Sequence, residues 1–138
     1  MNDQSKVKTE SYTPHENKIS CMNNLTERVK QWGKSKCLHS GRAQKQINYI
    51  IKEVAELIEA SEKLDAHDNG SIGTPCEDLL NEFDDAVGDV LVTVLNTAFA
   101  RYRDPAECLR MAVETIEKRK GKTVDGVFHK EEFTGFIK

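Results

Sequence analysis

The sequence has few residues that break helices and no long apolar run. It contains only three prolines and eight glycines in 138 residues, which excludes collagen-like and low-complexity chains. No apolar run approaches the 18 residues that a membrane-spanning helix needs. Because the first 20 residues hold no apolar run, we expect no signal peptide. Hydrophobic residues make up 38% and charged residues 31%, so we predict one globular domain.

Cysteine pairs with the spacing of metal ligands are also missing. The four cysteines and four histidines form no CxxC or HxxxH motif, which argues against a zinc site and a disulfide framework. Without an export signal, we expect a cytoplasmic protein whose thiols stay reduced as small core residues. These cysteines are Cys21, Cys37, Cys76 and Cys108.

Positive charge is absent from a long central segment. Residues 64–100 contain no Lys or Arg but eight Asp or Glu, whereas the whole chain has a net charge of −3. An acidic block with basic flanks suggests a cation site beside an anion site. The negative total argues against a general binder of nucleic-acid polymers.

The apolar periodicity predicts four helices, at about 24–34, 43–67, 75–102 and 105–120. In the second, Ile47, Ile51, Val54 and Ile58 recur at helical spacing. The Asp125-Gly126 pair predicts a tight hairpin between 123–124 and 127–128. The fold prediction is all-α: an antiparallel four-helix bundle with a small C-terminal β-hairpin. Residues 1–20 are interpreted as a mobile arm, and 21–138 as a single helical domain.

Carboxylates of the third predicted helix share one face. At 100° per residue, Asp85 and Asp89 lie within about 60° of each other, as do Asp78 and Glu82. Asn96 continues this stripe, and the helix is otherwise apolar from residue 86 to 99. Such a helix is usually buried. A buried Asp89 would therefore need a basic partner or a metal.

The second helix contributes Glu53 and Glu56, which antiparallel packing could bring opposite Asp85 and Asp89. Facing carboxylates hold divalent cations in helical bundles, and oxygen ligands favour Mg²⁺, with Mn²⁺ as a substitute. Alternatively, Glu53 and Glu56 form a solvated face with Lys52 as neighbour.

Basic and aromatic residues supply candidate substrate contacts. Lys118, Arg119 and Lys122 either complement a helix C-terminus or bind substrate phosphates. Trp32 is either a core anchor or a residue that stacks on a base. The sequence alone leaves both pairs of alternatives open.

The two acidic motifs resemble those of MazG-like all-α nucleoside triphosphate pyrophosphatases. That family carries ExxE on one helix, as at Glu53 and Glu56, and ExxD on the next, as at Asp89. The resemblance covers residues 25–128 and includes Asn96. The segment 118–128 resembles the tail of phage-type and mobile-element members. The chain departs from the pattern at Ala86, where ExxD would place Glu, and Asp85 is the residue that could replace it.

The resemblance implies the fold of these pyrophosphatases and a Mg²⁺-dependent hydrolase that cleaves nucleoside triphosphates to monophosphates and pyrophosphate, as in house-cleaning of the nucleotide pool. It implies metal ligation by Glu53, Glu56, Asp89 and Asp85, with Glu53 or Glu56 activating water. It also implies a homodimer, or a tetramer built from dimers. Candidate substrate contacts are Trp32, Asn96, Lys118, Arg119 and Lys122.

Three alternatives remain at this stage. The enzyme could be base-selective, acting on dUTP or dCTP. The chain could instead be a non-catalytic helical module that binds a nucleotide or a protein. Finally, it could be a structural bundle whose carboxylates are all paired with basic side chains.

Overall fold

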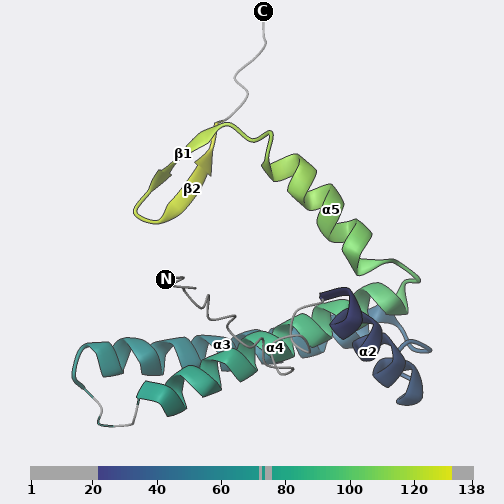
Figure 1. The fold of residues 1–138 in the computed structure, drawn as a ribbon, viewed down its shortest axis with the longest axis horizontal. Helices are drawn as coiled ribbons and strands as arrows, with labels where there is room; N and C mark the ends of the chain where they lie inside the picture. The colour runs from purple at the N-terminus through teal and green to yellow at the C-terminus, as the bar shows by residue number, and fades with distance from the viewer. Residues whose placement is uncertain (1–21, 72, 74–75, 132–138) are drawn as a thin grey trace, which may run out of the picture.

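The computed structural model describes residues 22–71, 73 and 76–131. It confirms the prediction of a mostly helical chain with a small C-terminal hairpin (Figure 1). The predicted arm over residues 1–20, and Cys21, lie outside the described residues, as do Thr74 and Pro75 before the third helix. The elements are α2 (Met22–Ser35), α3 (Ala43–Asp68), α4 (Cys76–Ala100), α5 (Pro105–Ile116), β1 (Gly121–Val124) and β2 (Val127–Lys130).

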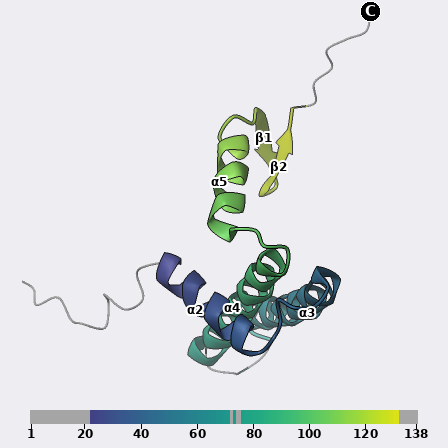
Figure 2. The same cartoon turned by 90° about the vertical axis from the view of Figure 1, so that its right-hand side faces the viewer.

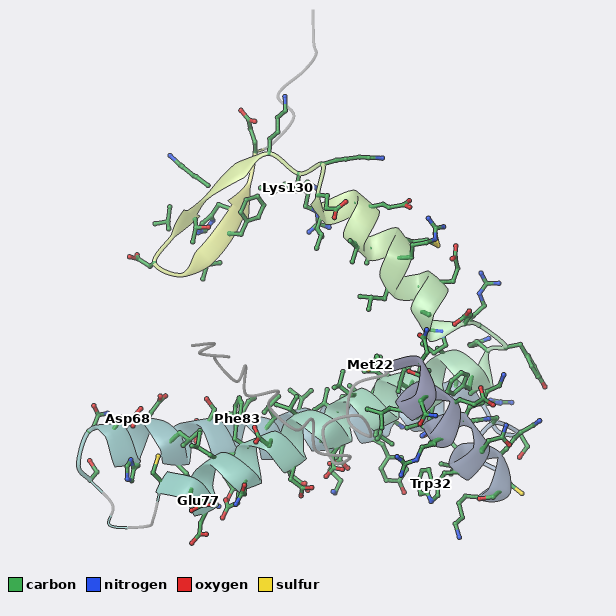
Figure 3. All side chains as sticks on the ribbon, in the orientation of Figure 1. Met22, Trp32, Asp68, Glu77, Phe83 and Lys130 are labelled. Atoms are coloured by element: carbon green, nitrogen blue, oxygen red, sulfur yellow. The ribbon has the colours of Figure 1, made fainter. Side chains whose placement is uncertain are left out.

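The long helices α3 and α4 run antiparallel and form the body of the molecule, and α2 lies across one end of this pair (Figures 1 and 2). Trp32 on α2 marks that end, whereas Asp68 and Glu77 mark the other (Figure 3). Small residues at the contact, among them Ala60 and Ala86, let the helices approach closely. The buried apolar residues are Ala43, Ala60, Leu79, Ala86, Phe99 and Ala100.

Helix α5 and the hairpin project away from the other helices (Figures 1 and 2). None of the residues of α5 is buried, and its apolar side chains Leu109, Met111 and Ile116 are exposed. Within the described part of one chain, α5 therefore does not pack into a bundle with the other helices, and the predicted four-helix bundle is not confirmed. The apolar periodicity correctly predicted that α5 is a helix. It carried no information about which helix α5 would pack against.

The start of α5 at residue 105 and the turn of the hairpin at Asp125 and Gly126 are confirmed. The Asp104 side chain caps α5 by accepting a hydrogen bond of 2.9 Å from the backbone N–H of Ala106, and Pro105 is the first helical residue. Between the strands, Asp125 and Gly126 have φ values of 50° and 74°, as a type I′ turn requires.

Helix α3 turns only part of its apolar surface toward α4. Ile47, Ile51, Val54 and Ile58 are exposed, whereas Gln46, Ala60 and Ala43 are buried. The stripe of β-branched residues therefore faces away from α4 and is unpartnered within the described chain. We refer to Ile47, Ile51, Val54 and Ile58 as the α3 apolar stripe.

The structure also bears on the expectations for the cysteines and for membrane-spanning helices. Cys37, Cys76 and Cys108 are exposed, so the interpretation of the cysteines as core residues is wrong for these three. None of the helices in the described ranges is both long and apolar enough to cross a membrane.

Candidate functional site

Three carboxylates meet between α3 and α4. Glu53, Glu56 and Asp89 each offer one oxygen, and these oxygens all lie within 4.8 Å of one another. The antiparallel pairing of the helices brings the ExxE pair opposite Asp89, as the motif spacing predicts. We call these three residues the acidic cluster. Three carboxylate oxygens are a donor set that suits a hard divalent cation such as Mg²⁺.

Lys52 lies against the acidic cluster. Its Nζ donates to Glu56 Oε1 at 2.7 Å and to Glu53 Oε1 at 3.4 Å. The hydrogen bond from Lys52 lowers the pKa of Glu56, and the same bond raises the pKa of Lys52. Glu53 is the more enclosed acid, because its side chain is 13% exposed, against 50% for Glu56. The cluster thus already attracts a cationic group, supplied here by the protein itself.

Asp89 is exposed rather than buried, which corrects the expectation from the apolar composition of α4. Leu91 and Val94 on the same helix are also exposed. The reason is that α3 and α2 pack against only part of the circumference of α4. The buried polar residue of this stripe is Asn96, which is 1% exposed.

Asp85 does not belong to the acidic cluster. It lines a neighbouring cavity of about 310 Å³ that also borders Glu56 and Asp89. Ala86 is buried in the wall of this cavity. The position where the family motif has Glu therefore presents only a methyl group, and the Asp85 side chain stands one residue away on the exposed side of α4.

A second cavity, of about 340 Å³, adjoins the acidic cluster. It shares Glu53 and Asp89 with the cluster and has Trp32 and Tyr49 in its wall. We call it the aromatic cavity. Trp32 is 49% exposed and so is not a buried core anchor. The remaining lining residues are Leu38, Gln46, Val92, Thr93 and Asn96.

Asn96 is held by a hydrogen bond to His39 that was not predicted from the sequence. Its Oδ1 accepts a hydrogen bond from His39 Nε2 at 2.8 Å. Gly33 makes room for this pair, because a Cβ atom there would lie 2.3 Å from Asn96 Oδ1 and 2.4 Å from His39 Nε2. His39 and Asn96 are 57 residues apart in the chain, and no motif links them, so this pairing could not be predicted from the sequence.

The predicted phosphate contacts lie elsewhere. Lys118 and Arg119 follow α5, and Lys122 lies on β1. These elements project away from α3 and α4 (Figures 1 and 2). Within one chain, the structure therefore does not bring the three basic residues to the acidic cluster. Lys118 instead lines a shallow groove with Arg110 and Glu114 on α5.

No protein-family model, curated protein or solved structure matches the chain. Function is therefore inferred from the residues of the site and from the motifs that resemble those of MazG-like enzymes.

Proposed function

We propose that the chain is a Mg²⁺-dependent nucleoside triphosphate pyrophosphohydrolase of the MazG-like all-α type. It would cleave a nucleoside triphosphate between the α and β phosphates and release a monophosphate and pyrophosphate, acting on the cytoplasmic nucleotide pool. One observation carries the proposal: three carboxylates lie within 4.8 Å of one another, and two of them, Glu53 and Asp89, border a cavity walled by Trp32 and Tyr49. A cation-binding acidic cluster beside an aromatic cavity suits a ligand that joins phosphates to a base.

Each acid has a role in this proposal. Glu53, Glu56 and Asp89 would hold the divalent cation, with Asp85 as a further ligand from the neighbouring cavity. A Mg²⁺ ion held by these acids would supply positive charge to offset the negative charge that develops on the phosphate. Glu53 and Glu56 are the candidates to take the proton of the attacking water.

The aromatic cavity would hold the nucleobase. Trp32 and Tyr49 offer ring faces on which a base can stack, and Gln46 and Asn96 offer amide groups at the same cavity. An amide group can both donate and accept hydrogen bonds. If these amides discriminate between bases, the enzyme would be base-selective, for example specific for dUTP or dCTP.

Self-association is the second part of the proposal. The α3 apolar stripe and the apolar side chains of α5 are exposed, and a large exposed apolar surface typically marks an interface. A homodimer, or a tetramer built from dimers, would cover these surfaces. In such an assembly, Lys118, Arg119 and Lys122 could contact the phosphates bound in the partner's site. Within one chain, the three basic residues do not reach the acidic cluster.

The test is a panel of ribo- and deoxynucleoside triphosphates incubated with the protein in Mg²⁺ and in EDTA. We expect Mg²⁺-dependent release of pyrophosphate with an equal amount of monophosphate from at least one nucleotide. Release of inorganic phosphate with a diphosphate would contradict the proposed bond cleavage. The ranking of the nucleotides would show whether the enzyme is broad or base-selective.

A non-catalytic nucleotide-binding module is the second candidate. It is favoured by Ala86, which is buried where the motif has Glu, and by the position of Asp85 outside the acidic cluster. For this candidate, calorimetry would detect nucleotide binding in Mg²⁺, while no nucleotide of the panel would yield pyrophosphate.

A further inference from the structure

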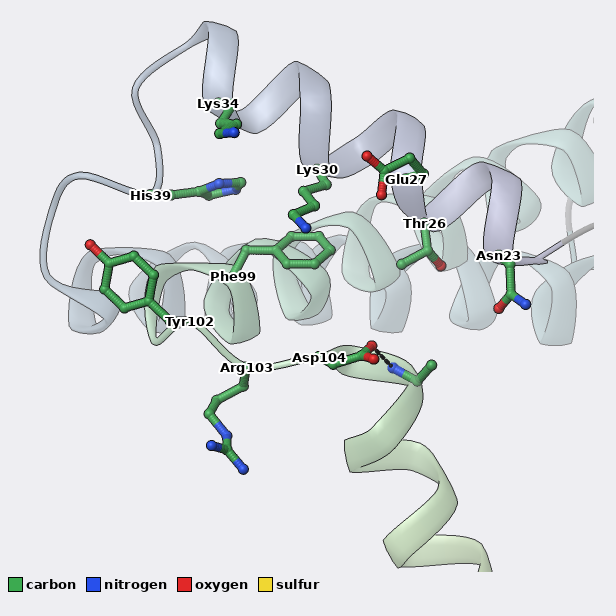
Figure 4. Close-up of a pocket in the computed structure, with 11 residues that line it drawn as sticks. Asn23, Thr26, Glu27, Lys30, Lys34, His39, Phe99, Tyr102, Arg103 and Asp104 are labelled. Carbon is green, nitrogen blue, oxygen red and sulfur yellow. Dashed lines mark hydrogen bonds between the residues drawn. The ribbon is translucent and has the colours of Figure 1, made fainter.

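A third cavity is lined by His39, the hydrogen-bond partner of Asn96. It measures about 770 Å³ and is bordered by α2, by the end of α4 and by the connection to α5 (Figure 4). Phe99 and Tyr102 belong to it, ten and thirteen residues after Asp89. At 1.5 Å per residue, its floor lies about 15 Å along α4 from the acidic cluster. We call it the basic groove.

Cationic side chains surround the basic groove. Lys30 and Lys34 project from α2 on one side, and Arg103 lies on the other (Figure 4). Among the described residues, none of the ion pairs includes any of these three. The two acids of the groove, Glu27 and Asp104, accept hydrogen bonds from neutral groups of Gln31 and Ala106, which leave their negative charge in place. The groove therefore carries three positive and two negative side chains, a net charge of +1, and both of its lysines lie on α2.

Aromatic rings line the same groove. The His39 and Phe99 rings pack at 5.3 Å between centroids, and Lys30 Nζ lies 5.8 Å from the Phe99 centroid. Tyr102 is 91% exposed and has a φ of 55°, a left-handed conformation that favours glycine. An aromatic residue thus occupies a costly backbone position while its ring remains free to contact a ligand.

We propose that the basic groove binds a nucleoside monophosphate, with its phosphate at Lys30, Lys34 and Arg103 and its base against the Tyr102 ring. Lysine and arginine form charge-assisted hydrogen bonds with phosphate oxygens, and bases stack on aromatic side chains without regard to sequence. Binding at this groove requires neither the acidic cluster nor hydrolysis, so it can be tested whether or not the chain is an enzyme.

The groove also communicates with the aromatic cavity through two side chains. His39 borders the groove and donates to Asn96, and Asn96 lines the aromatic cavity. A ligand that shifts the His39 ring would therefore move the amide group proposed to contact the substrate base. A monophosphate, which is the product class of the proposed reaction, would in this way act on the site that forms it. This last step rests on the proposed function, whereas binding does not.

Isothermal titration calorimetry with AMP and with inorganic phosphate, in EDTA, tests the proposal. We expect AMP to bind, and the double variant Lys30→Gln/Lys34→Gln to bind it at least about tenfold more weakly, since charge-assisted bonds are lost. The double variant Lys36→Gln/Lys45→Gln, which removes two exposed lysines outside the groove, should keep the original affinity. Equal affinities of the two double variants would overturn the proposal, as would no AMP binding at millimolar concentration.

Two more variants separate the parts of the proposal. Tyr102→Leu should weaken AMP binding about fivefold or more, through lost stacking, and leave inorganic phosphate binding unchanged. If AMP and phosphate bound equally tightly to the unmodified chain, the groove would be a bare anion site and its assignment to nucleotides would be wrong. Asp89→Asn should keep AMP affinity. A loss there would place the ligand at the acidic cluster and refute the groove.

Discussion

Gly33 shows how one missing side chain positions a functional residue. Asn96 is buried and bonded to His39 only because Gly33 leaves space for both side chains. Gly33 lies inside α2, which continues to Ser35. A glycine within a helix is otherwise unfavourable. Gly33 is tolerated in this helix because Asn96 and His39 pack where its side chain would be. Helical periodicity in the sequence does not predict such a tertiary contact.

A matched pair of glycine substitutions tests this account. Gly33→Ala should lower the free energy of unfolding by about 1–3 kcal/mol, because the added methyl group collides with Asn96 and His39. Gly88→Ala, on α4 with no atom within 4 Å of the added Cβ, should raise it by about 0.5–1 kcal/mol. Urea denaturation measures both. A stabilising Gly33→Ala would contradict the contact.

Lys52 is expected to compete with a bound cation. Its ammonium group bonds to Glu53 and Glu56 of the acidic cluster, so Lys52→Met should tighten Mg²⁺ binding. The increase should be about two- to threefold, since an exposed ion pair contributes little. Calorimetric titration with Mg²⁺ measures it. Lys45→Met, an exposed lysine of the same helix outside the cluster, serves as the control. If both variants bound Mg²⁺ equally, Lys52 would not occupy the cation's place.

At the scale of the element, the helix boundaries were largely predictable and the helix partners were not. The helix α5 begins at residue 105 and Asp125 occupies the hairpin turn, both as predicted, because these features depend on the local chain alone. The α3 apolar stripe has the spacing typical of a buried helix face, yet it is exposed. A helix with apolar residues on more than one side does not reveal which side meets its neighbour. The acidic cluster was predictable because both its motifs face the interhelical contact.

Three helices end with a residue of positive φ, and only one of them uses glycine. Gly70 follows α3 with a φ of 72°, whereas Cys37 and Tyr102 occupy the matching positions after α2 and α4. In each case the next N–H reaches back to a carbonyl five residues earlier, as from Ser71 to Ala66. This is the Schellman pattern, in which glycine is favoured.

Cys37→Gly is therefore expected to stabilise the fold by about 0.5–1 kcal/mol, because glycine reaches a φ of 57° without strain. Gly70→Ala should destabilise it by a similar amount. Thermal unfolding followed by circular dichroism measures both changes. A lower melting temperature for Cys37→Gly would show that the thiol makes a contact worth more than the backbone strain.

At the scale of the whole molecule, the exposed apolar surfaces are the basis for the proposed self-association. The α3 apolar stripe and α5 lack partners within the described chain. The amphipathic character of these helices was visible in the sequence, but the sequence could not tell an intramolecular bundle from an intermolecular one. Both arrangements bury the same apolar residues.

Sedimentation velocity tests self-association. We expect the unmodified chain to sediment as a dimer or tetramer at micromolar concentration. Ile51→Lys, in the centre of the α3 apolar stripe and 67% exposed, should shift it toward monomer. Met22→Lys, a similarly exposed residue at the start of α2, should not. A monomeric unmodified chain would contradict the expectation.

The central claim is that the acidic cluster performs Mg²⁺-dependent pyrophosphate release. The most direct measurement compares pyrophosphate release by Asp89→Asn and by Asp84→Asn, which removes an acid of the same helix outside the cluster. Loss of a group that only orients a metal ligand costs about 10- to 100-fold. We therefore predict that Asp89→Asn loses more than about 100-fold in rate, while Asp84→Asn stays within about twofold of the unmodified chain. Equal rates for the two variants would contradict the account.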